Sequence, residues 1–90
     1  MFAEACTRLA IEYGVEVKVS STFTTFGGEK CPVVKLTVKK DQWVLDDYIE
    51  EWALRSYGYD DILSYRLEST AKTLLESVAM RKIKEEPNDD

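Results

Sequence analysis

The chain has 90 residues, of which 44% are hydrophobic and 32% charged, with only four glycines and two prolines. These values are typical of one globular domain, and they exclude a disordered, collagen-like or disulfide-scaffold chain. The formal net charge of −5 at pH 7 argues against broad nucleic-acid binding, and the lack of histidine removes the commonest metal ligand and proton-transfer side chain. We therefore expect no enzymatic activity, no catalytic residues, no metal site and no cofactor.

Residues 2–13 predict a short amphipathic helix, because apolar side chains recur near helical spacing. Gly14 follows where a left-handed C-terminal cap belongs. From residue 15 to residue 24 the period changes to two, which predicts a half-buried strand. The face of this strand that we expect to be buried contains Val15, Val17, Val19, Ser21 and Phe23.

The run Gly-Gly-Glu-Lys at residues 27–30 predicts a turn that leads into a second strand over residues 34–39. Together the two strands predict an antiparallel hairpin. Pro32 cannot donate a ladder hydrogen bond, so we expect it at the start of the second strand or on an edge. The outward face of the hairpin carries Lys18, Lys35 and Lys39.

The next segment allows two interpretations. Residues 43–45 predict either a brief third strand, which we favour, or the beginning of a helix. From about residue 45 to residue 57 the pattern predicts an amphipathic helix. Its apolar face contains Leu45, Tyr48, Ile49 and Trp52, and its acidic face contains Asp46, Asp47, Glu50 and Glu51.

The last part of the chain predicts a helix of about 20 residues with one apolar stripe. The stripe contains Leu63, Leu67, Ala71, Leu74, Leu75 and Val78. We therefore expect an α+β fold, with an N-terminal helix, an antiparallel hairpin or three-stranded sheet, and two C-terminal helices packed on one sheet face. Residues 1–83 are expected to form this single domain, and residues 84–90 a disordered acidic tail.

The α-β-β-β-α order resembles the double-stranded-RNA-binding domain in outline, with residues 65–80 in the place of that family's final helix. The resemblance implies a nucleic-acid-binding domain, and because residues 15–40 carry a net charge of +3, we expect such a domain to use the three hairpin lysines for phosphate contacts. That family places a lysine-rich cluster at the start of its final helix, whereas this chain has Asp60 and Asp61 in the region. Nucleic-acid binding is therefore the alternative hypothesis.

The leading hypothesis is a small acidic protein-binding module without catalytic activity. Carboxylates beside apolar side chains are typical of interfaces in which charged residues surround a few aromatic anchors. The candidate partner-binding residues are Trp43, Asp46, Asp47, Glu50, Glu51 and Leu54. The same carboxylates also fit a solvated helix face, and Trp43 also fits a strand residue that faces the sheet.

We expect the partner to be a protein with a basic surface. In size and charge the chain is similar to phage-encoded inhibitors of host defence, including anti-CRISPR and anti-restriction proteins that occlude nucleic-acid sites. A second alternative is a structural homo-oligomer subunit that associates through the spare face of the last helix. That face contains Ile62, Tyr65, Met80 and Ile83.

Two further expectations concern the cysteines and the cellular location. Cys6 and Cys31 form no CxxC pair and are expected to be reduced, buried thiols, although a disulfide between them is possible. No apolar run reaches the roughly 18 residues of a transmembrane helix. We therefore expect a soluble cytoplasmic protein that does not contact membranes.

Overall fold

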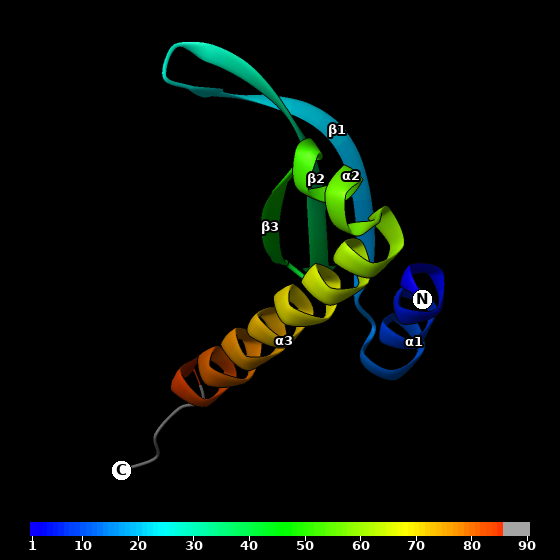
Figure 1. Ribbon diagram of the computed structural model, residues 1–90. Helices are drawn as coiled ribbons and strands as arrows, with labels where there is room; N and C mark the ends of the chain where they lie inside the picture. The colour runs from blue at the N-terminus through cyan, green and yellow to red at the C-terminus, as the bar shows by residue number, and fades with distance from the viewer. Residues whose placement is uncertain (86–90) are drawn as a thin grey trace.

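The computed structural model describes residues 1–85, in which a helix is followed by three antiparallel strands and two further helices (Figure 1). The elements are α1 (Phe2–Tyr13), β1 (Glu16–Phe26), β2 (Glu29–Lys40), β3 (Trp43–Glu50), α2 (Glu51–Tyr57) and α3 (Tyr59–Glu85). The three strands form one sheet in the order β1-β2-β3. The predicted α+β fold, with the C-terminal helices packed on the sheet, is confirmed.

Two tight turns fix the register of the sheet. Gly27 and Gly28 join β1 to β2, with φ angles of 60° and 83°, in the left-handed region that glycine adopts without a steric penalty. Asp41, with a φ of 55°, begins the two-residue turn between β2 and β3. Short turns of this kind fix which residues of the two adjoining strands pair with each other. Each strand therefore has a defined face toward the helices.

The main core lies between one face of the sheet and the helices α1 and α3. Leu36 and Val38 of β2 are fully buried there, together with Leu67 of α3. The predicted stripe of the last helix is confirmed, because its central residues face this core. The other buried members of the cluster are Ala5, Leu9, Val15, Ala71, Leu74 and Val78. We call this side of the sheet the covered face and the other side the open face.

The predicted helix that begins near residue 45 is wrong in its first half. Residues 43–50 form β3, which pairs with Val33–Lys40 of β2, and the helix begins only at Glu51. Backbone pairing with β2 imposes a period of two, so Leu45 and Ile49 point inward while Tyr48 points outward. The favoured third strand is confirmed and is longer than predicted.

The β1–β2 hairpin continues past the end of β3. Pairing between β2 and β3 ends at Val33 and Glu50, whereas β1 and β2 remain paired as far as Phe26 and Glu29. We call residues 23–32 the arm, and Figure 1 shows it projecting beyond the helices. Pro32 lies in the arm, where β2 has a neighbour on one side only, in agreement with the predicted edge position.

The helix α3 extends to Glu85 and so includes the first two residues of the predicted tail at 84–90. Residues 86–90 lie outside the described part of the chain. No helix within residues 1–85 is long and apolar enough to cross a membrane.

Candidate functional site

The structure divides the predicted acidic face between two sides of the sheet. Successive residues of a strand point to opposite faces, so Asp46 and Glu50 lie on the open face and Asp47 lies on the covered face. Glu51 is the first residue of α2. The four carboxylates therefore do not form one continuous surface, and the interpretation of this face as a single docking site is corrected.

Asp47 is bound to α3 by Arg66. The guanidinium donates from Nε to Oδ2 at 2.7 Å and from its terminal NH2 to Oδ1 at 2.6 Å, and the Thr70 hydroxyl lies 3.5 Å from Oδ2. These hydrogen bonds raise the pKa of Arg66 above its usual value. A carboxylate held by a bidentate pair between two elements has few acceptor sites left for a partner. Asp47 is therefore a residue that joins β3 to α3.

Leu54 and Trp43 also belong to the interior rather than to an exposed surface. Leu54 has no exposed area and packs with Val34 and Ile49 in a second core cluster beneath α2, so this structure does not present it on the surface where a partner contact was predicted. Trp43 is half-buried against the main core, with the Arg81 guanidinium 4.9 Å from the centre of its ring. This agrees with the alternative interpretation, in which Trp43 faces the sheet.

Glu51 accepts a hydrogen bond from Arg55, one helical turn later. This hydrogen bond is also the main cause of the raised pKa of Arg55. The pair satisfies Glu51 within α2, so the predicted acidic surface is reduced to Asp46 and Glu50.

A different set of residues is exposed where the site was predicted. Tyr48 is 49% exposed and Trp52 is 63% exposed, whereas the predicted helix placed both on its apolar face. The Trp52 indole N–H donates to the Glu50 carboxylate, which places the ring beside the open face of β3. We call this surface the β3 patch, formed by Val44, Asp46, Tyr48, Glu50 and Trp52.

The charges of the β3 patch differ in how they are neutralised. Asp46 lies 3.8 Å from the Lys35 ammonium and accepts a hydrogen bond of 2.7 Å from Thr37. No cationic side chain among residues 1–81 lies within 4.0 Å of the Glu50 carboxylate. The patch therefore presents two large aromatic side chains beside a carboxylate that a partner could neutralise.

Tyr48 and Val44 could have been found from the sequence. If residues 43–49 are assigned to a strand, the period of two places Val44, Asp46 and Tyr48 together on the face opposite Leu45 and Ile49. Trp52 gave no such signal, because its exposure depends on where β3 ends and α2 begins.

The three hairpin lysines lie on the open face of the sheet, as predicted. Lys18 pairs in register with Thr37, Lys35 with Ser20, and Lys39 with Glu16. Each of these lysines has a carboxylate near it on the same face. Glu16 pairs with Lys39, Asp46 lies in the same row of paired residues as Lys18, and Glu50 lies in the row next to that of Lys35 on this face. Phosphate binding needs accumulated positive charge, and this balanced face does not favour it.

Cys6 and Cys31 are free thiols, each half-buried. Burial raises the pKa of the Cys6 thiol, because desolvation disfavours the thiolate. Among the side chains of residues 1–81, no three Cys, Asp or Glu are arranged so that they could hold a metal ion.

Comparisons of the chain with known protein families, with curated proteins and with solved structures find no match. What the chain does must be inferred from its own surface.

Proposed function

We propose that this chain is a small non-enzymatic protein-binding module that contacts its partner through the β3 patch. The observation that carries the proposal is the joint exposure of Tyr48 and Trp52 beside Glu50. Trp and Tyr are enriched at the centres of protein interfaces, where truncating one such residue costs about 2 kcal/mol or more of binding free energy.

The chemistry of the patch favours a partner with a basic surface. Glu50 accepts from the Trp52 indole and can accept further hydrogen bonds from an Arg or Lys side chain. The net charge of −5 also steers the chain toward positively charged surfaces. If that surface normally binds nucleic acid, the module would act as an inhibitor of the phage-encoded kind by occluding it.

The test is affinity capture with the double variant Tyr48→Ala/Trp52→Ala. Tyr65→Ala is the matched control, because Tyr65 is 73% exposed on α3, away from the patch. We expect the wild type and the control to capture the same protein from nuclease-treated lysate. With that protein purified, the double variant should bind it at least about 30-fold more weakly, because two anchors are lost.

Charge reversal provides a second measurement. Asp46→Lys/Glu50→Lys should weaken binding to a basic partner, whereas reversal at Asp47 would disturb the bond to Arg66 and is not informative. Equal affinity of the wild type and both double variants would refute the proposal. Capture that disappears with nuclease, and with Lys18→Ala/Lys39→Ala, would favour the nucleic-acid alternative instead.

A further inference from the structure

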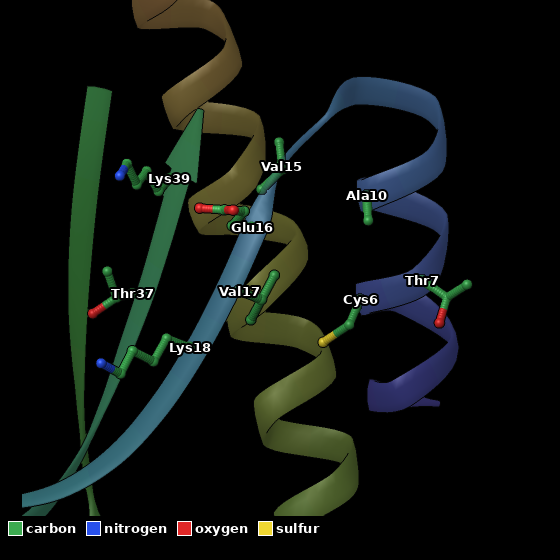
Figure 2. Close-up of a pocket in the computed structure, with 9 residues that line it drawn as sticks. All are labelled: Cys6, Thr7, Ala10, Val15, Glu16, Val17, Lys18, Thr37 and Lys39. Carbon is green, nitrogen blue, oxygen red and sulfur yellow. The ribbon is translucent and has the colours of Figure 1, made fainter. Parts of the chain in front are cut away.

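The outer edge of β1 is uncovered. β1 pairs only with β2, and no backbone hydrogen bond within residues 1–85 reaches its other side. A hollow of about 760 Å³ lies along this edge, between β1 and α1. It is lined by Val17 from the covered face and by Lys18 from the open face, so it passes around the edge of the strand. Figure 2 shows Cys6 reaching from α1 into this hollow.

The two edges of the sheet differ in how they are protected against further pairing. Proteins block edge strands with charged side chains, prolines and bulges. β3 carries Asp46, Asp47 and Glu50, which protect its edge. In contrast, the ten residues 19–28 contain no charge and no proline in a chain that is 32% charged. The β1 residues of this stretch, 19–26, are therefore open to pairing with another strand.

The apolar face of β1 is covered at one end only. Val15 is buried immediately before the strand, whereas Val19 is 42% exposed and Phe23 is 66% exposed. These two residues were predicted to be buried with the rest of that face. On the neighbouring strand β2, Leu36, which pairs with Val19, and Val34, which pairs with Ser21, are buried by α3 and α2, but these helices do not extend over β1. Val19 and Phe23 are therefore free to pack against another element.

We propose that a second copy of this chain covers them, with the two β1 strands pairing antiparallel about a twofold axis at Ser21. In this register Val19 of each copy lies opposite Phe23 of the other, so the exposed apolar residues of each strand meet those of its partner. Lys18 lies opposite Thr24 and Glu16 opposite Phe26, so no like charges face each other. The arm of each copy extends toward the hollow beside α1 of the other.

The pairing joins two three-stranded sheets into one sheet of six strands. It uses the β1 edge and leaves the β3 patch of each copy at an outer edge. It therefore does not depend on the proposed protein-binding function, and each proposal can fail without the other.

Sedimentation equilibrium over a concentration series tests the dimer. We expect the wild type to dimerise and Val19→Lys/Phe23→Lys to raise the dissociation constant at least about tenfold, because lysines then face lysines across the axis. Val19→Glu/Phe23→Lys should dimerise again, because each Glu then faces a Lys. Tyr65→Lys on α3 is the control and should dimerise like the wild type, with circular dichroism confirming that every variant is folded.

A wild type that remains monomeric at millimolar concentration would overturn the proposal. Dimerisation that is unchanged in Val19→Lys/Phe23→Lys would also overturn it. If Tyr65→Lys alone dissociates the dimer, the interface is the spare face of α3 and the β1 pairing is wrong.

Discussion

Asp47 places a negative charge on the covered face of the sheet, and its ion pair with Arg66 offsets the free-energy cost of that charge. The carboxylate accepts two hydrogen bonds from the guanidinium, at 2.7 and 2.6 Å, and its side chain is 21% exposed. A bidentate ion pair that is partly buried contributes more to the free energy of unfolding than a fully solvated one, although the exposure of Arg66 limits this contribution. The pair is therefore an anchor between β3 and α3.

We predict that Asp47→Ala lowers the free energy of unfolding by about 1–2 kcal/mol, because the guanidinium loses both acceptors. Asp46→Ala is the matched control, since Asp46 is exposed and its ion pair with Lys35 spans 3.8 Å. Its loss should stay below about 1 kcal/mol. Urea unfolding followed by tryptophan fluorescence measures both values. Equal losses would show that the ion pair with Arg66 contributes no more to stability than the exposed ion pair of Asp46.

At the scale of elements, α2 is held to the sheet by one fully buried side chain. The helix has seven residues, too few to be stable without packing, and Leu54 is its buried residue. Leu54 contacts Val34 and Ile49, with Ile62 and Leu63 of α3 packed around them. The position of Trp52 in the β3 patch depends on this contact, because Trp52 lies on the same short helix.

We predict that Leu54→Ala lowers the free energy of unfolding by about 2–4 kcal/mol, because it removes buried methyl groups and leaves a cavity. Trp52→Ala, in the same helix but exposed, should change it by less than about 0.5 kcal/mol. Thermal and urea unfolding of the two variants measure the difference. A Leu54→Ala protein as stable as the wild type would mean that α2 is not packed on the sheet in solution.

The sequence predicts α1, the hairpin and α3 because each has one clear period and a clear stop signal, such as Gly14 or Gly27. Residues 45–50 fit two periods. A helix would place their carboxylates on one side. A strand places Asp47 on the inward face, and judged by hydrophobic pattern alone a charge at an inward position argues against a strand. The strand is favoured because Arg66, 19 residues later, meets that carboxylate, and no local pattern contains this information.

The predicted site residues are separated in the structure for the same reason. Once residues 45–50 are a strand, Tyr48 moves to the surface, and the later start of α2 buries Leu54 and exposes Trp52. Only Asp46 and Glu50 of the six predicted partner-binding residues remain in the β3 patch. The prediction of these residues as one surface depended on assigning residues 45–50 to a helix, and that assignment was wrong.

At the scale of the whole molecule, the chain is extended for its length. Its radius of gyration is 15.6 Å, whereas a compact domain of 90 residues has about 12 Å. The 27-residue helix α3 and the projecting arm account for the difference. A two-stranded hairpin without a covering layer is marginally stable in water, so the arm should open more readily than the rest of the sheet.

Hydrogen exchange tests this expectation and connects it to the proposed dimer. At low concentration, amides of residues 23–26 and 29–31 should exchange at least roughly a hundredfold faster than those of residues 34–38, because local opening needs less free energy where few side chains are buried. As the concentration rises, the amides of residues 23–26 in β1 should gain protection while those of residues 29–31 gain less, because only β1 would acquire a new neighbour. Slow exchange throughout the arm at low concentration would show that it is stabilised within one chain, and equal gains in both strands would argue against pairing at the β1 edge.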